Sequence, residues 1–364
     1  MAQIQKVIGL MSGTSLDGVD AALLETDGAD VVRPGPALTI AYDGETRALL
    51  RAALEEARHV AEGAPVPQSI REAERVLTEK HAEAVKALVA KVGPVSLIGF
   101  HGQTILHRPE RRWTWQIGDG ALLARLTGID VVNDFRSADV KAGGQGAPLV
   151  PLYHAALARN SSLARPLAVV NIGGVGNVTY IDGDTVLAFD TGPGNAPIDD
   201  WMQRHTTTPV DLNGAFAATG KVNDAALDAM LANSFFDRVP PKSLDRMDFG
   251  MAAVENLSPA DGAATLTSFT AASIARAREH FPQAPQTWII CGGGRHNSTL
   301  MGMLQARINA QVLKAEGARW DGDALEAEAF AYLAVRSRLG LPLSLPTTTG
   351  VAQPITGGKY HSAR

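Results

Sequence analysis

The first distinctive motif of the chain spans residues 8 to 20 and reads Ile8-Gly9-Leu10-Met11-Ser12-Gly13-Thr14-Ser15-Leu16-Asp17-Gly18-Val19-Asp20. It lies inside a longer pattern. Gln3 to Met11 is apolar and predicts a strand, and Val19 to Glu25 predicts a second strand that ends at the Asp27-Gly28 turn. The small, turn-prone residues between the two strands predict a hairpin with a glycine-rich tip.

This tip can bind a phosphate or simply turn the chain. Its glycines let the backbone approach a phosphate closely, and the hydroxyls of Ser12, Thr14 and Ser15 can donate hydrogen bonds. Asp17 can hold Mg²⁺ through water. The alternative is a plain hairpin turn with capping hydroxyls. The tip alone leaves both interpretations open.

The second half of the chain repeats this order of elements. Leu167 to Ile172 predicts a strand, Gly173 to Asn177 a glycine-rich tip, and Val178 to Ile181 a returning strand. Each half then contains a helix, a proline break, a strand and a glycine-containing loop with a histidine. These stretches are Ser69 to Lys91, Val95 to Phe100 and His101 to Thr104, then Asp261 to His280, Thr287 to Cys291 and Gly292 to Asn297. The order predicts an α/β fold built from a duplicated unit with a cleft between the copies, with two unrelated α/β domains as the alternative.

Other helices are expected at Glu45 to Glu62, around Leu300 to Lys314, and at Ala324 to Arg338, whereas Gly28 to Pro36 reads as a connecting segment. We place the first lobe at residues 1–138, with the segment from about 340 to 364 packing back on it, and the second lobe at residues 139–339.

The bulk composition excludes several classes of protein. With 364 residues and a net charge of −5, the chain has no basic footprint for nucleic acid and no attraction to an anionic membrane. The single cysteine, Cys291, allows neither an intramolecular disulfide nor a cysteine-rich zinc site. Apolar runs long enough for a signal peptide or a membrane span are absent, which predicts a soluble, cytoplasmic protein.

The common nucleotide-binding motifs do not occur. No Gly-x4-Gly-Lys-Ser/Thr is present, which excludes a P-loop enzyme. Gly292-x-Gly294-x-x-Asn297 and Gly174-x-Gly176-x-x-Thr179 both lack the last glycine of the dinucleotide-binding fingerprint.

Asp190 is the strongest single candidate for catalysis. It follows the predicted strand Thr185 to Phe189 and precedes Thr191-Gly192-Pro193-Gly194-Asn195, so its carboxylate is expected at a sheet edge that faces a cleft. A carboxylate there suits a general base or an Mg²⁺ partner. The alternatives are an N-cap for a helix near Pro197 and an aspartic protease. The protease needs two such carboxylates, and the chain has one Asp-Thr-Gly and no Asp-Ser-Gly.

The remaining candidates are less specific. Gly292 to Gly294 can lie under an adenine or a ribose, or can form a bare turn, and Cys291 reads as an inert buried thiol. His101 and His296 can be ligand contacts or polar surface residues. The glutamates 326 and 328 can be functional or can form a solvated helix face.

Taken together, these stretches resemble the anhydro-N-acetylmuramic acid kinase family. The resemblance runs from residue 8 to near residue 360 in the family's order. It rests on 8–20, Gly99 to Thr104, Gln116 to Asp119, Val132 to Arg136, Gly143 to Pro151, Asn171 to Gly174, Phe189 to Asn195, Cys291 to Asn297, and the stretches Glu326-Ala327 and Ala329 to Ala331. It implies a two-lobed actin/hexokinase-like, ribonuclease H-like duplicated fold, with ATP and an amino sugar in the interdomain cleft.

The resemblance also implies a role for each motif. Asp190 is the base that activates water. ATP, with Mg²⁺ whose direct ligands remain unknown, is held by Gly13, Thr14, Ser15, Leu16, Asp17, Gly18, Val19, Asp20, Gly173, Gly174, Gly192, Gly292, Gly293 and Gly294. The sugar is contacted by Glu326, His101, Thr104 and Arg136. The implied protein is a homodimer that binds neither nucleic acid nor membrane.

The implied reaction opens the 1,6-anhydro ring of 1,6-anhydro-N-acetylmuramic acid with water and phosphorylates O6. The products are N-acetylmuramic acid 6-phosphate and ADP, in cell-wall recycling. Two alternatives remain: a kinase of the same fold that acts on another sugar or small acid, and a slow ATPase that senses sugar or assembles like actin.

Overall fold

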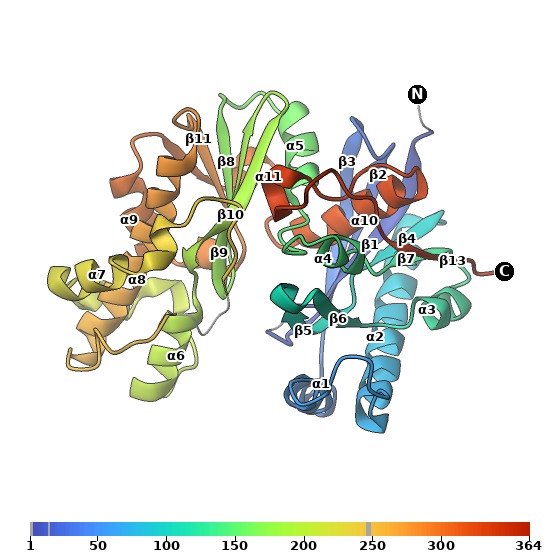
Figure 1. Cartoon of the computed structure of the whole chain (residues 1–364), viewed down its shortest axis with the longest axis horizontal. Coiled ribbons are helices and arrows are strands. Elements are labelled where there is room, and N and C mark those ends of the chain that lie inside the picture. Colours follow the sequence, from blue (N-terminus) through green and yellow to red (C-terminus); the bar gives the residue numbers. More distant parts are fainter. Residues whose placement is uncertain (1–2, 14, 245–248) are drawn as a thin grey trace. The chain divides into compact units, whose positions relative to one another are not determined.

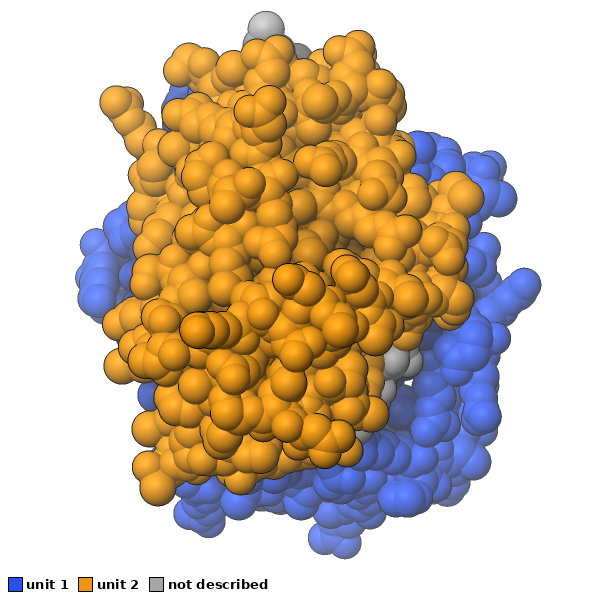
Figure 2. All heavy atoms as spheres, turned by 90° about the vertical axis from the view of Figure 1, so that its left-hand side faces the viewer, with its two compact units in different colours: residues 1–160, 324–364 blue, residues 161–323 orange. Residues whose placement is uncertain are grey.

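A computed structural model describes residues 3–13, 15–244 and 249–364 of the chain. The elements in Figure 1 fall into two compact units. Unit 1 comprises Met1–Asn160 and Ala324–Arg364, and unit 2 comprises Ser161–Asp323; Figure 2 shows them in blue and orange. Among the described residues, no helix is long and apolar enough to cross a membrane.

Unit 1 is built on a six-stranded sheet with the order β13-β7-β4-β1-β2-β3. The strands are β1 (Gln5–Met11), β2 (Gly18–Thr26), β3 (Val32–Ala41), β4 (Leu97–Phe100), β7 (Val131–Asn133) and β13 (Lys359–His361). β5 (Gln103–Arg108) and β6 (Trp113–Ile117) form a separate hairpin. The helices are α1 (Gly44–Ala57), α2 (Gln68–Val92), α3 (Gly120–Thr127), α4 (Ser137–Lys141), α5 (Pro151–Arg159), α10 (Leu325–Arg338) and α11 (Pro346–Thr349).

The two faces of this sheet carry different helices, because successive side chains of a strand point to opposite faces. Ile8 and Leu10 of β1 belong to a core that includes the buried residues of α1 and α2. Gly9, between them, faces α10, where a Cβ would lie 1.7 Å from the carbonyl oxygen of Ala327. On the neighbouring strand, a Cβ at Gly99 would lie 2.0 Å from the carbonyl oxygen of Phe330. The glycines therefore let α10 pack directly on the sheet backbone.

Unit 2 has a five-stranded sheet with the order β10-β9-β8-β11-β12. The strands are β8 (Leu167–Ile172), β9 (Val175–Asp182), β10 (Thr185–Pro193), β11 (Thr287–Cys291) and β12 (Gln311–Lys314). The helices are α6 (Ala196–His205), α7 (Asp224–Leu231), α8 (Pro259–Arg276) and α9 (Ser298–Arg307). α8 contributes to two apolar cores, one shared with the sheet and one shared with α6 and α7.

The two sheets have the same topology, which confirms the predicted α/β fold and its duplication. In unit 1 the series β3-β2-β1-β4-β7 has two antiparallel pairings followed by two parallel ones. The series β10-β9-β8-β11-β12 of unit 2 has the same sequence of pairings. In each unit a long helix comes before the fourth strand of the series: α2 before β4, and α8 before β11.

Three local expectations differ from the structure. Gly28 to Pro36, expected as a connection, leads into and forms part of β3; this strand lies at the edge of the sheet, where proline is tolerated. The helix expected at Leu300 to Lys314 ends at Arg307, and its last part is β12. The glutamate-containing stretch of α10 is no solvated face, because Glu328 is only 1 % exposed.

The unit boundaries also differ from the division at residues 138 and 339. α5 belongs to unit 1, because Tyr153 Oη donates a 2.8 Å hydrogen bond to Oε2 of Glu328 on α10. At the end of α5, Asn160 Nδ2 donates to the carbonyl oxygen of Asp30 at 2.8 Å. α10 itself packs on β1 and β4 of unit 1, as the contacts of Gly9 and Gly99 show.

Candidate active-site residues

The tip between β1 and β2 is held in shape by its neighbours in unit 1. Leu16 N–H donates to the carbonyl oxygen of Gly13 at 3.1 Å, and Leu16 has a φ of +58°. This left-handed conformation costs a non-glycine residue about 1–2 kcal/mol, and burial of the Leu16 side chain in the core offsets it. Arg47 Nε donates to the Leu16 carbonyl at 3.1 Å, and Tyr42 N–H donates to the Asp17 carbonyl at 3.0 Å.

The same tip leaves open space where a phosphate is expected. Among the described residues, a Cβ on Gly13 would meet within 4 Å only atoms of Ser15, the nearer at 3.5 Å, so these neighbours do not require glycine there. The side chains of Ser15 and Asp17 are exposed. Thr14, also predicted to hold phosphate, lies outside the described residues. Among the described members of the predicted phosphate loop, Ser15 and Asp17 are therefore exposed, and Gly13 has room beside its Cα.

Three other predicted phosphate contacts have structural roles in unit 1. A Cβ on Gly18 would lie 2.3 Å from the carbonyl oxygen of Ile40, so β2 and β3 require glycine there. Val19 is fully buried in the core. Asp20 accepts a 2.6 Å hydrogen bond from Thr39 Oγ1 through Oδ1.

In unit 2, three of the predicted nucleotide glycines lie around Asn195. The backbone N–H of Asn195 donates to the carbonyl oxygen of Gly173 at 2.7 Å. A Cβ on Gly293 would meet Asn195 Nδ2 at 3.9 Å, and the nearest described atoms to Cβ positions on Gly173 and Gly174 lie at 3.7 Å and 3.6 Å. These three positions have room for a ligand. The sequence predicts no role for Asn195, although its position after a strand is a signal for a ligand contact.

The other predicted nucleotide glycines are required by packing. A Cβ on Gly192 would lie 2.7 Å from Ser273 Cβ of α8. Gly292, with a φ of +72°, has the Asn171 side chain 2.2 Å from its Cβ position, and Gly294 has the Ile172 side chain at 2.4 Å. Nucleotide contacts of these three stay predictions.

Asp190 lies within β10, which continues to Pro193 and does not end at Phe189 as predicted. A register shift between Asp190 and Gly192 forms a β-bulge, a feature that re-aims side chains. The N-cap of α6 is Asn195, so the helix-cap alternative for Asp190 is wrong.

The contacts of the Asp190 carboxylate suit a proton acceptor. Its Oδ2 accepts a 2.8 Å hydrogen bond from the backbone N–H of Leu244. Burial raises the pKa of Asp190 to about 7, while the Leu244 N–H acts in the opposite direction. A general base is most effective when its pKa lies near the working pH.

The structure brings three of the predicted sugar contacts together in unit 1. Arg136 Nε donates to His101 Nε2 at 2.9 Å, and His101 Nδ1 lies 2.8 Å from the carbonyl oxygen of Gly102, which assigns the proton to Nδ1. Burial lowers the pKa of Arg136 to about 10, although the charge of Glu326, followed by that of Asp139, raises it. His101 is 4 % exposed and its pKa is far below the ordinary value because of burial, so it is no surface histidine.

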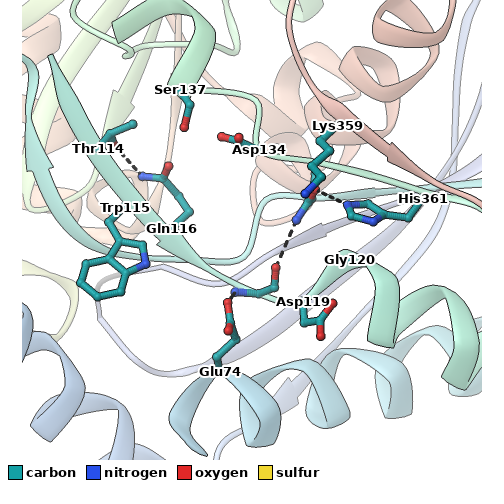
Figure 3. A pocket seen from close by; sticks show the side chains of 12 residues that line it. Glu74, Thr114, Trp115, Gln116, Asp119, Gly120, Asp134, Ser137, Lys359 and His361 are labelled. Atoms are coloured by element: carbon teal, nitrogen blue, oxygen red, sulfur yellow. Dashed lines mark hydrogen bonds between the residues drawn. The ribbon is translucent and has the colours of Figure 1, made fainter. Parts of the chain in front are cut away.

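Thr104, the fourth predicted sugar contact, lies on β5 and accepts a 3.1 Å hydrogen bond from Gln116 Nε2. Gln116 lines a polar pocket of about 330 Å³ within unit 1 (Figure 3). The pocket is lined by Glu74, Thr114, Trp115, Gln116, Gly118, Asp119, Gly120, Asn133, Asp134, Ser137, Lys359 and His361.

The wall of this pocket is tied together by hydrogen bonds. Gly118 N–H donates to Glu74 Oε1 at 3.0 Å, and Asn133 Nδ2 donates to the Gly118 carbonyl at 3.1 Å. Asn133 Oδ1 lies 3.0 Å from His361 Nε2 (Figure 3). Asp134 is exposed and has a φ of +55°. Sequence reasoning assigned no pocket here, although Gln116 to Asp119 and Val132 to Arg136 were noted as motifs.

The residues available to a metal ion are few in the described part of the chain. Among residues 3–13, 15–244 and 249–364, no group of three or more His, Cys, Asp or Glu side chains is placed to hold a metal. Mg²⁺ commonly keeps several waters and uses one or two carboxylates with substrate phosphates. The exposed Asp17 beside the open Gly13 can supply such a carboxylate.

Comparison with known proteins finds relatives that match almost the whole chain. The chain is 56 % identical over 362 residues to the anhydro-N-acetylmuramic acid kinase of Rhodospirillum rubrum, covering 98 % of this chain and 94 % of that one. It is 54 % identical over 361 residues to the enzyme of the same name from Rhizorhabdus wittichii, covering 97 % and 98 %.

Solved structures of lower identity also align. A ROK family glucokinase from Streptomyces griseus covers 90 % of this chain and 99 % of its own, with a TM-score of 0.43 and 14 % identity. A xylulose kinase from Lactobacillus acidophilus covers 98 % and 93 %, with a TM-score of 0.45 and 11 % identity. The family model described as anhydro-N-acetylmuramic acid kinase matches residues 5–362. The chain therefore belongs to the anhydro-N-acetylmuramic acid kinase family.

Proposed function

We propose that this protein is an ATP-dependent kinase of the actin/hexokinase-like fold that opens the 1,6-anhydro ring of 1,6-anhydro-N-acetylmuramic acid and phosphorylates O6. The proposal rests mainly on the surroundings of the Asp190 carboxylate. This carboxylate sits at a β-bulge and has a pKa near neutrality, and its unit also holds the open glycines around Asn195. Family membership supplies the substrate class.

In the proposed reaction, Asp190 accepts a proton from water while the water oxygen forms a bond to the anomeric carbon. The bond between that carbon and O6 breaks, and O6 forms a bond to the γ-phosphorus of ATP as ADP leaves. The negative carboxylate also stabilises the positive charge that develops at the anomeric carbon. A single carboxylate can thus serve both needs.

Each unit holds residues for which we propose a role. Gly13, with its open Cα, and the exposed Ser15 are proposed to hold the phosphates, and Asp17 to hold Mg²⁺, which supplies charge stabilisation when bound. Gly174 and Gly293, near Asn195, are proposed to lie beside the nucleoside. The three glycines support the proposal because packing does not require a glycine at any of them, while each leaves its backbone open to a ligand.

The sugar is proposed to contact Arg136, His101 and Glu326, with Thr104 nearby. Arg136 is fixed by His101 and by the carbonyl oxygen of Gly146, to which Nη1 donates at 2.7 Å. A guanidinium fixed at two points keeps its remaining donors in a defined direction, which suits the hydroxyl and carboxylate oxygens of an acidic amino sugar.

The test is a coupled assay that follows ADP release with the anhydro sugar, with intact N-acetylmuramic acid and with glucose. ADP release with the anhydro sugar alone, with N-acetylmuramic acid 6-phosphate identified by mass, supports the proposal. Turnover of another sugar or acid in its place would identify a kinase of the same fold with a different substrate. We further propose a cytoplasmic homodimer that acts in cell-wall recycling; light scattering on the purified protein tests the dimer.

A further inference from the structure

The segment Pro240–Leu244, here called the Lys242 segment, runs alongside β10 at Asp190. The backbone N–H of Asp190 donates to the carbonyl oxygen of Lys242 at 2.9 Å. Two residues further on, the Leu244 N–H donates to Asp190 Oδ2 at 2.8 Å. One hydrogen bond therefore fixes the Asp190 backbone and the other fixes its carboxylate, and both come from the same short segment of unit 2.

The side chain of Lys242 anchors this segment on its other side. Lys242 is 9 % exposed, and its Nζ donates to the carbonyl oxygens of Phe235 at 3.2 Å and Phe236 at 3.3 Å. Nζ also lies 4.7 Å from the centre of the Phe235 ring, and 3.3 Å from His280 Nε2. Contacts with two carbonyl oxygens and an aromatic face fix the position of this ammonium group.

The ammonium of Lys242 also lies near Phe189, the residue directly before Asp190. Lys242 Nζ lies 5.9 Å from the centre of the Phe189 ring, and the Phe189 and His280 rings lie nearly perpendicular with 5.4 Å between their centroids. The ammonium, Phe189 and His280 thus form one packed group next to Asp190 in the chain. A shift of Lys242 would be transmitted to Asp190 through both the Lys242 segment and Phe189.

The lowered pKa of Lys242 shows that placing its ammonium here costs free energy. Burial is the largest cause that lowers the Lys242 pKa, to about 8, and the nearby Arg276 and Arg238 lower it further. Asp237 and Glu279 act in the opposite direction. A lysine in an exposed loop would avoid this cost, so the position of Lys242 calls for a compensating role.

We infer that Lys242 is a positioning residue for the reaction, which anchors the Lys242 segment so that the Leu244 N–H holds the carboxylate of Asp190 towards the attacking water. This inference rests on the proposed role of Asp190 as the base. Lys242 acts through Leu244 and Phe189 and does not itself touch the reacting atoms.

The test compares Lys242→Met, which removes the ammonium but keeps a long apolar stem, with Lys242→Arg, which keeps a cation. Lys314→Met, on the exposed last residue of β12, is the matched control. We expect Lys242→Met to lower kcat about tenfold to a hundredfold with little change in KM for ATP, the scale of a misplaced reacting group. Lys242→Arg should recover part of this loss, and Lys314→Met should match the wild type.

A direct titration separates positioning from stability. The ¹³C resonance of the Asp190 carboxyl should titrate at a higher pH in Lys242→Met, because a displaced Leu244 N–H no longer lowers the pKa of Asp190. Leu244→Pro, which removes the N–H donor but leaves the anchor, should raise the Asp190 pKa. A loss of thermal stability without any change in this titration would overturn the inference, as would unchanged kcat in folded Lys242→Met.

This titration needs no turnover, so it also distinguishes the two proposals. If the wild type fails to phosphorylate the anhydro sugar but the Asp190 carboxyl still shifts with Lys242, the proposed function fails and the structural link stands. If the enzyme is active, Asp190→Asn is inactive and Lys242→Met behaves as the wild type, the positioning role fails alone.

Discussion

Arg136 Nε and His101 Nε2 are joined by a 2.9 Å hydrogen bond, between a guanidinium next to α4 and a buried imidazole at the end of β4. The imidazole stays neutral because burial and the Arg136 charge both lower its pKa. His101 can therefore accept this hydrogen bond and orient Arg136 at neutral pH.

Arg136→Lys should weaken sugar binding. Lysine cannot reproduce the two-point attachment to His101 and the Gly146 carbonyl, so its charge would lose a defined direction. We expect KM for the sugar to rise about tenfold or more, the scale of a charged hydrogen bond, with KM for ATP unchanged. Arg125→Lys on the exposed face of α3 is the control. Equal loss for both substrates would show that Arg136 supports the fold and not the sugar.

Asp190→Asn should fold, bind both substrates and lose about a hundredfold or more in turnover, because the amide keeps the shape but cannot accept the proton. Asp184→Asn, in the exposed turn after β9, is the control. Steady-state kinetics and ATP binding by calorimetry measure the two effects. If ATP binding collapses while turnover survives, Asp190 is a nucleotide or Mg²⁺ ligand and Glu326 becomes the candidate base.

The pH dependence of turnover follows from the Asp190 pKa. A base works in its deprotonated form, and burial raises this pKa to about 7. We expect kcat to fall as the pH drops below about 7, and a pH profile measured between 5 and 9, roughly two units on either side, checks this. An acid limb near the ordinary aspartate value of about 4 would show that another group is the base.

The same pKa predicts an effect on stability with the opposite trend. The pKa of Asp190 in the folded protein lies above the unfolded value of 3.8. The contribution of Asp190 to the free energy of unfolding is therefore fully present below pH 3.8 and is lost as the pH rises through about 7. At pH 8, well above this window, Asp190→Asn should therefore melt at a higher temperature than the wild type, as thermal unfolding without ligands can show. A lower melting temperature would mean that the carboxylate has a stabilising partner in the folded state.

Two glycines of the first hairpin should behave differently on substitution. Gly13→Val should leave thermal stability nearly unchanged and raise KM for ATP about tenfold or more, because the new side chain occupies the open space over the tip. Gly9→Ala should destabilise unit 1, because its Cβ would lie 1.7 Å from the Ala327 carbonyl oxygen. Normal ATP kinetics in Gly13→Val would mean that the tip is only a turn.

Most strands could be predicted because their apolar runs are bounded by glycine and proline. The hairpin of β1 and β2 and its counterpart in unit 2 follow from such runs. β3 was missed because Pro34 and Pro36 argue against a strand in a sheet centre, and only the observed position at the edge removes that objection. Glu328 was misjudged because local charge does not reveal a buried tyrosine partner 175 positions away in the chain.

The site was predicted less completely than the fold. Residue type and a place after a strand were enough to make Asp190 and His101 candidates, whereas Arg136 came from the resemblance to the family. Lys242 had no such signal, since a lysine after two prolines reads as a surface loop, and its role depends on contacts with Phe235 and Phe189 that only folding creates. Likewise, the glycines of the tips look alike in sequence. Their surroundings separate Gly13 from Gly18.

The packing of α10 on Gly9 and Gly99 has a consequence for synthesis on the ribosome. The segment that forms unit 2 is continuous and leaves the exit tunnel before α10 does, whereas unit 1 needs a helix that begins at Leu325. During translation, the later-encoded unit 2 can reach its native state while the earlier-encoded sheet still exposes the face over Gly9 and Gly99 to chaperones and proteases. A chain stopped at Asp323 should accordingly show protease resistance in residues 161–323 and sensitivity in the strands before them.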